Sequence, residues 1–113
     1  MTVLKNVRPL GGEVTDVRIE GQVIAQIGPD LHDDEVVEGN GAILLPGLVD
    51  LHTHLREPGR EDAETVESGT RAAAAGGFTC VHAMANTTPV ADTAGVVEQV
   101  WRLGQEAALV DVR

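Results

Sequence analysis

The second half of the chain alternates strand and helix patterns in the manner of parallel β/α units. Three segments have the β-branched and apolar character of buried strands: GLVDLHTHL (47–55), FTCVHAMA (78–85) and ALVDV (108–112). Between the first two, EDAETVESGTRAAAAGG (61–77) has acids in its expected first turn and two glycines at its end. Asp92 or Thr93 can cap a second helix, in which apolar residues recur at helical spacing. Strands joined through helices run parallel, so the sequence predicts an α/β fold.

This alternation stops inside its third unit. A closed (β/α)₈ barrel needs eight units and roughly 250 residues. The chain has 113 residues, with two units and the opening of a third. The pattern therefore predicts either a small open sheet or the start of a TIM-type barrel, formed by residues 46–113.

Residues 1–45 are expected to form a separate β-rich segment, part of a β-sandwich. In DVRIEGQVIAQIG (16–28), apolar and polar residues alternate on both sides of Gly21, which predicts a hairpin with one wet face. The acidic segment PDLHDDEVVEGNG (29–41) is expected to be a solvated loop, and AILL (42–45) a short strand.

Charge and cysteine content narrow the classes of partner. With 18 acidic and 8 basic residues, the net charge of −10 repels phosphate backbones and anionic membrane surfaces, so neither nucleic acid nor a membrane is expected as a partner. GAILLPGLV (41–49) is too short, and too broken by Pro46 and Gly47, to span a bilayer. A single cysteine cannot form an internal disulfide, and no signal peptide precedes the strands, so we expect a cytoplasmic protein.

The segment DLHTHLREPG (50–59) contains two of the four histidines. Strict alternation along a strand would place four polar side chains on one face (Asp50, His52, His54, Arg56) and a mostly apolar set on the other, suited to packing under a helix (Val49, Leu51, Thr53, Leu55). Imidazoles at i and i+2 can lean together until both nitrogens lie about 2.0–2.1 Å from one zinc. Asp50 can accept a hydrogen bond that orients one of them.

The pair alone leaves two interpretations open. His-x-His also occurs by chance, as ordinary polar residues near a strand end. Here the pair lies where a strand meets its βα loop, the edge at which parallel α/β proteins place their chemistry, and an arginine follows. This position favours a metal site.

Longer motifs resemble one family. LPGLVDLHTHLREPG (45–59), followed by ETVESGTRAAAAGGFTCVHAMANTTPVADT (64–93), resembles the N-terminal part of dihydroorotases of the amidohydrolase superfamily. The lead-in before it resembles that family's small β-domain. The resemblance implies a metal-dependent (β/α)₈ barrel with one or two zinc ions. The implied reaction is the interconversion of N-carbamoyl-L-aspartate and L-dihydroorotate, small-molecule substrates of pyrimidine biosynthesis.

The resemblance also implies roles for four residues. His52 and His54 match the first two metal ligands, Arg56 matches the arginine that holds the substrate carboxylate, and Asn86 matches an asparagine that also contacts it. Without the resemblance, an Asx turn in the ANTTP connection would be the preferred role for Asn86. Arg56 favours dihydroorotase over the allantoinases and hydantoinases, which usually lack an arginine at this place.

Two residues differ from the family pattern, and further ligands of a metal site are missing. Ala85 replaces a common proline, and His82 a usual apolar residue. A catalytic zinc site typically has three protein ligands. The only lysine, Lys5, lies in the N-terminal strand region, His32 lies in the acidic loop, and Asp111 lies on the third strand.

No catalytic residue is therefore assigned, and we expect the chain to be inactive alone. Its partner would be the remainder of a barrel or further copies of the chain. The alternatives are a non-catalytic binding or assembly module derived from a dihydroorotase, and a related hydantoinase- or allantoinase-type hydrolase.

Overall fold

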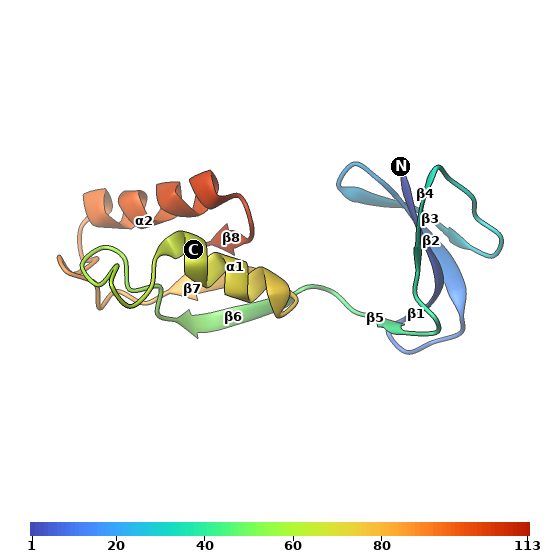
Figure 1. Ribbon diagram of the computed structural model, residues 1–113, viewed down its shortest axis with the longest axis horizontal. Coiled ribbons are helices and arrows are strands. Elements are labelled where there is room, and N and C mark those ends of the chain that lie inside the picture. Colours follow the sequence, from blue (N-terminus) through green and yellow to red (C-terminus); the bar gives the residue numbers. More distant parts are fainter. The chain divides into compact units, whose positions relative to one another are not determined.

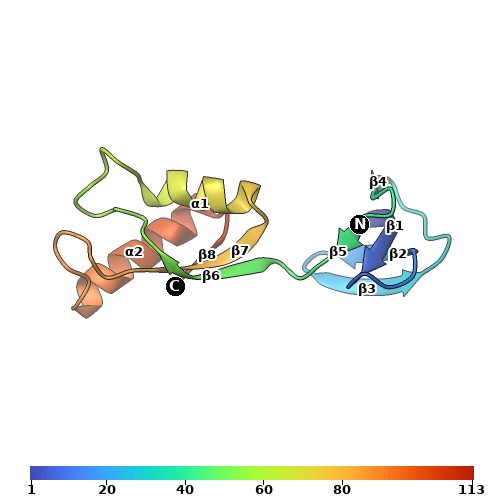
Figure 2. The same cartoon turned by 90° about the horizontal axis from the view of Figure 1, so that it is seen from below.

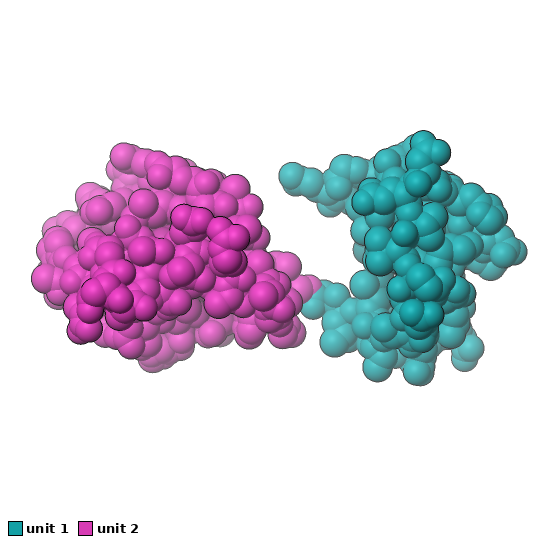
Figure 3. All heavy atoms as spheres, viewed as in Figure 1, with its two compact units in different colours: residues 1–46 teal, residues 47–113 magenta.

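The computed structural model describes residues 1–113, which form two compact units, Met1–Pro46 and Gly47–Arg113 (Figures 1 and 3). The division falls one residue beyond the predicted end of the β-rich segment at residue 45. We call these parts the β-unit and the β/α-unit.

The β-unit is a single five-stranded sheet with the order β3-β2-β1-β4, in which β5 also pairs with β1. Its strands are β1 (Thr2–Pro9), β2 (Thr15–Glu20), β3 (Val23–Gly28), β4 (Glu35–Glu38) and β5 (Ile43–Leu44). The predicted hairpin across Gly21 is confirmed, because β2 and β3 pair antiparallel. Its expected single wet face is not found, since every residue of β3 except Gly28 is exposed. That this sheet forms part of a β-sandwich stays a prediction.

The acidic segment differs from its expected loop. Residues 35–38 form β4, which pairs in parallel with β1 from Thr2↔Glu35 to Lys5↔Glu38. This pairing satisfies backbone groups of β4, although all four of its side chains are exposed. The strand is therefore set by a distant partner rather than by its own weak apolar pattern.

Asp16 ties three parts of the β-unit together. Its side chain is buried, with the residue 4% exposed, and its carboxylate accepts hydrogen bonds from the backbone N–H groups of Asn6 (2.9 Å) and Leu31 (3.1 Å). Lys5 Nζ lies 2.9 Å from Asp16 Oδ2 and also donates to the Leu31 carbonyl at 3.1 Å. The Asn6 amide and the Lys5 ammonium lower the pKa of Asp16 below its ordinary value of 3.8.

Acid is expected to weaken the β-unit through Asp16. Because the pKa is lower in the folded chain, ionised Asp16 contributes its full stabilisation above the unfolded value of 3.8, and this contribution is lost as pH falls through the folded value. Hydrogen-exchange protection factors of the Asn6 and Leu31 amides should decrease in that range. The Asp16→Asn variant should start with lower protection and respond less to acid. Wild-type protection that stays unchanged far below pH 3.8 would contradict this account.

The β/α-unit confirms the predicted alternation. Parallel strands are arranged in the order β6-β7-β8, comprising β6 (Leu48–Thr53), β7 (Phe78–Ala83) and β8 (Asp111–Val112). The connections are α1 (Val66–Ala75) and α2 (Ala94–Ala107). Both helices lie on the same side of β6 and β7 in Figure 1, and Figure 2 shows α1 above the strands from a second direction.

The core of this unit lies between the helices and the sheet. Its buried residues are almost all valine, whose branched side chain packs well against the pleated surface of a strand. They are Leu55, Val66, Val81, Val100, Val110 and Val112, with Ala73, Phe78, Ala83 and Leu103 packed around them.

The start of α1 differs from its prediction. The helix begins at Val66, so the acids of residues 61–64 precede it, and only Glu67 lies in its first turn. Thr65 fixes this boundary, because its side chain accepts from the Ser68 backbone N–H while Ser68 Oγ accepts from the Thr65 N–H. This reciprocal capping box satisfies two backbone donors at one place.

Two glycines of α2 are expected to respond oppositely to alanine. A Cβ added at Gly104 would lie 2.5 Å from the Val112 Cβ, whereas one at Gly95 meets nothing within 4 Å. Gly104→Ala should destabilise the unit by about 1–3 kcal/mol through overpacking. Gly95→Ala should stabilise it by about 0.4–1 kcal/mol, because alanine loses less backbone entropy in a helix.

Urea unfolding followed by the fluorescence of Trp101, the only tryptophan, would measure both changes. Because Trp101 lies on α2 itself, the signal reports this unit. Changes of the same sign in the two variants would contradict the packing of α2 on β8.

Neither helix meets the length and hydropathy that a membrane-spanning segment requires.

Candidate active site

The candidate site lies where β6 ends, and the pairing of β6 with β7 decides which side chains gather there. Asp50 pairs with Val81 and Thr53 with Ala83, so the two residues between them on β6 lie opposite a single residue of β7. Such a register shift interrupts the alternation of side chains. The strict alternation predicted from the sequence is therefore wrong for this strand.

The register shift changes the environment of the apolar residues of β6. Val49 and Leu51 were predicted to pack under a helix, but they are 52% and 70% exposed. Asp50 and Thr53 instead line a pocket under α1 with Leu55 and residues of α1 and β7. Asp50 thus lies on the helix side of the sheet.

His52 and His54 have a spacing that suits a shared metal ion. Their ring centroids lie 5.2 Å apart and their planes are tilted by 59°. If each ring gave one nitrogen to a zinc ion at about 2.0–2.1 Å, with about 1.2 Å from nitrogen to ring centre, a tetrahedral angle would place the centres roughly 5 Å apart. The distance between the rings is thus compatible with a metal ion bound by both histidines, and the metal site stays a prediction.

Asp50 contacts the histidine pair through the backbone of His52. Its Oδ1 accepts a hydrogen bond from the backbone N–H of His52 at 2.9 Å, not from an imidazole. This bond is the main reason that the pKa of Asp50 lies below its ordinary value of 3.8. An ionised Asp50 thus helps to hold the irregular end of β6 in shape.

Asn86 contacts the histidine pair directly. Nδ1 of His54 lies 2.9 Å from Oδ1 of Asn86, although the two residues are 32 positions apart. An amide oxygen only accepts, so this contact requires the His54 proton on Nδ1. The sequence predicted His54 at the end of one strand and Asn86 in the connection that follows the next strand, but not this bond.

Two loops hold Asn86 in place. The pairing of β6 and β7 continues beyond the strands, since the Met84 N–H donates to the Thr53 carbonyl at 2.8 Å. The Thr88 N–H donates to the Pro58 carbonyl at 2.9 Å, which joins the loop after β7 to the loop after β6. Gly59 permits this close approach, because a Cβ there would lie 2.5 Å from the Thr88 carbonyl oxygen and its φ is +107°.

Arg56 follows His54 in a left-handed backbone conformation, with φ of +64°. Its side chain is exposed and makes no hydrogen bond or ion pair within the chain. A free guanidinium presents five donors in a planar fork, which matches a carboxylate. Arg56 is thus free to bind an anionic ligand, and it lies close to the two histidines in the sequence.

The chain does not complete a metal site. No group of three or more His, Cys, Asp or Glu side chains is close enough to hold an ion. Lys5 is bound to Asp16 in the β-unit, His32 is exposed there, and Asp111 accepts a hydrogen bond from the Arg113 side chain at 2.7 Å.

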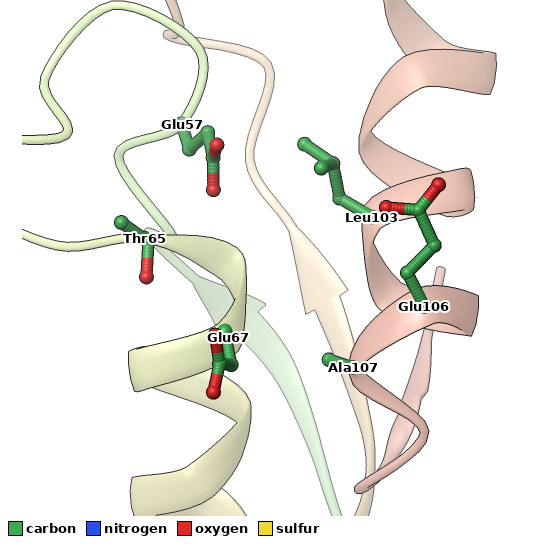
Figure 4. Close-up of a pocket in the computed structure, with 6 residues that line it drawn as sticks. All are labelled: Glu57, Thr65, Glu67, Leu103, Glu106 and Ala107. Carbon is green, nitrogen blue, oxygen red and sulfur yellow. The ribbon is translucent and has the colours of Figure 1, made fainter.

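A separate open pocket of about 430 Å³ lies between α1 and α2 (Figure 4). It is lined by Glu57, Thr65, Glu67, Leu103, Glu106 and Ala107, and includes neither histidine. Glu57, which the sequence did not single out, accepts from the Val66 N–H at 2.7 Å and so caps α1. Glu57 therefore serves the end of a helix, and the glutamates of this pocket do not form a second metal site.

Comparison with known proteins agrees with the motifs. Residues 41–113 match the family described as dihydro-orotase-like. A dihydroorotase of Streptomyces coelicolor is 65% identical over 114 residues, and one of Mycobacterium tuberculosis is 56% identical over 114 residues. These alignments cover 99% and 97% of this chain but only 27% and 26% of the relatives. The chain thus spans about a quarter of their length.

Solved structures share the fold. An L-hydantoinase (dihydropyrimidinase) of Arthrobacter aurescens superposes with a TM-score of 0.79 at 22% identity, covering 91% of this chain and 24% of that one. An N-isopropylammelide isopropylaminohydrolase of Burkholderia multivorans superposes with a TM-score of 0.70 at 25% identity, covering 99% of this chain and 36% of that one. The solved structures share the fold, and the family match over residues 41–113, more than half of the chain, shows that the chain belongs to the dihydroorotase-like family.

Proposed function

We propose that the chain supplies part of the active site of a dihydroorotase, an enzyme that interconverts N-carbamoyl-L-aspartate and L-dihydroorotate. The observation that carries this proposal is the meeting of His54 and Asn86 at the carboxyl ends of adjacent parallel strands, within the segment that matches the family. Parallel α/β proteins build their sites at this edge. Relatives that are named dihydroorotases support the same activity.

In this proposal His52 and His54 are two ligands of a zinc site with one or two ions. A bound zinc ion would act as a Lewis acid toward water and the cyclic amide. The chain's own contribution is to orient both imidazoles, through the Asp50 bond to the His52 backbone and the Asn86 bond to His54. The remaining ligands and the proton-transferring acid would lie in the part of a dihydroorotase that this chain does not include.

Arg56 and Asn86 would bind the carboxylate that both proposed substrates carry. The guanidinium supplies charge and a bidentate fork, and the amide N–H groups of Asn86 add directional donors without charge. Both are exposed and leave their donors free within the chain. Binding at this place would fix the ring relative to the metal ligands.

A complete (β/α)₈ barrel is part of the proposal. The three parallel strands have helices on one face, and apolar residues of β6 are exposed on the other, whereas all-parallel sheets are ordinarily covered on both faces. The remaining strands of a barrel, or further copies of the chain, would cover them. A role in pyrimidine biosynthesis, together with a single free cysteine, favours a cytoplasmic location.

A chimera tests the activity. Residues 1–113 would replace the matching segment of the Streptomyces coelicolor dihydroorotase, which is 65% identical to them. The chimera with zinc should turn over L-dihydroorotate, and the isolated chain should not. Hydantoin and allantoin, as competing substrates, would reveal a related hydrolase. A folded chimera that turned over only hydantoin or allantoin, or an isolated chain that turned over dihydroorotate, would refute the proposal.

A further inference from the structure

We infer that Asn86 is a positioning residue for His54: it holds the His54 proton on Nδ1, so that Nε2 presents its lone pair to a metal ion, while its own amide N–H groups remain free for the substrate carboxylate. This inference rests on the proposed function for the metal ion and for the identity of that carboxylate. The bond to His54 is a property of the chain itself, at 2.9 Å from Nδ1 to Oδ1.

The two ends of the Asn86 amide have different chemistry. The oxygen only accepts, and it faces His54. The nitrogen has two donors and makes no hydrogen bond within the chain, on a residue that is exposed. One side chain can therefore bind a protonated ring nitrogen and an anion at the same time.

The hydrogen bond to Asn86 determines which of its two tautomers neutral His54 adopts. An imidazole has two distinct nitrogens, and the hydrogen bond made by one decides which of them can bind a metal. With the proton on Nδ1, the lone pair of Nε2 is available. The His52 ring has no such hydrogen bond, because the contact of His52 with Asp50 is made by its backbone N–H.

Asn86 is held on both sides along the chain. Before it, the Met84 N–H is bonded to the Thr53 carbonyl, and after it the Thr88 N–H is bonded to the Pro58 carbonyl. Buried Thr87 adds a hydrogen bond from its hydroxyl to the Pro89 carbonyl at 2.7 Å. The amide is therefore placed before any ligand arrives, which lowers the entropy lost when metal or substrate binds.

Nitrogen-15 NMR of the histidine side chains tests the tautomer without metal or substrate. At a pH where the imidazoles are neutral, His54 should have its proton on Nδ1, and the Asn86→Ala variant should shift toward a mixture. The His54→Gln variant identifies the signal. Thr88→Ala is the matched control, because it changes an exposed side chain in the same loop and keeps the backbone N–H that binds Pro58. A wild-type proton on Nε2 of His54, which would need the reversed amide, would overturn the inference.

The chimera provides a second readout, the zinc affinity. Asn86→Ala should lower it by about 10- to 100-fold, as expected for loss of a group that orients a metal-binding histidine. Asn86→Asp retains an acceptor and should bind zinc within a few-fold of wild type, yet it should raise the KM for dihydroorotate, because a carboxylate repels the substrate. If the Asn86→Ala chimera bound zinc as tightly as the wild-type chimera, the inference would be overturned. The proposed dihydroorotase activity would not be contradicted by that result. An inactive wild-type chimera with the Nδ1 tautomer would instead reject the proposed function alone.

Discussion

Replacing His52 or His54 with alanine in the chimera is expected to lower both zinc content and kcat/KM for dihydroorotate by more than about 100-fold, because loss of a group that merely orients a ligand already costs 10- to 100-fold. The physical reason is the geometry of the pair, whose ring centres lie 5.2 Å apart. With one imidazole removed, the ion would lose one of its two histidine ligands.

The control for this loss is His32→Ala. His32 is an exposed histidine of the β-unit, so its removal should change neither quantity. Zinc content would be measured by atomic absorption after gel filtration, and folding by circular dichroism. A folded His54→Ala chimera that kept its zinc and its turnover would exclude His54 from the metal site.

Replacing Arg56 with alanine should reduce kcat/KM for dihydroorotate by roughly 30-fold to several thousand-fold, the equivalent of the 2–5 kcal/mol lost when one partner of a buried charge pair is removed. Most of the change should be in KM, because the guanidinium binds a carboxylate that does not react. Arg56→Lys should recover only part of the loss, since an ammonium keeps the charge without the planar fork.

A neutral substrate separates this effect from general damage. Any turnover of hydantoin, which has no carboxylate, should be little changed by Arg56→Ala. Arg60→Ala is the matched control, because Arg60 is an exposed arginine of the same loop that pairs with Asp62 at 3.0 Å. Equal losses for both substrates would indicate a structural role for Arg56 instead of carboxylate binding.

The local patterns of the sequence predicted most of the elements in the β/α-unit. Apolar strands, glycine stops and helical spacing report the preferences of neighbouring residues, which are short-range effects. The hairpin of β2 and β3 was predictable for the same reason, because Gly21 and a period of two lie within one short segment. His52 and His54 were recognisable because two ligands two residues apart need no other part of the fold.

Pairing between distant residues was not predictable from these patterns. Residues 35–38 form a strand only because β1 accepts them as a parallel neighbour. The register shift between Asp50 and Thr53 exposes Leu51, which strict alternation would have buried. The start of α1 likewise depended on one specific pair of hydrogen bonds, between Thr65 and Ser68, rather than on the acids before it.

The parallel β/α order, the hairpin, the pair of histidines and the family could all be recognised in the amino-acid sequence, since each depends on residues close together along the chain or on a long motif. The folded chain was needed to see that Asn86 meets His54, that Asp50 holds the His52 backbone, and that Gly59 lets one loop approach Thr88. These contacts depend on strand register and loop packing to within a fraction of an ångström. No periodicity in the sequence encodes such distances, because they arise when segments 30 residues apart pair through their backbones.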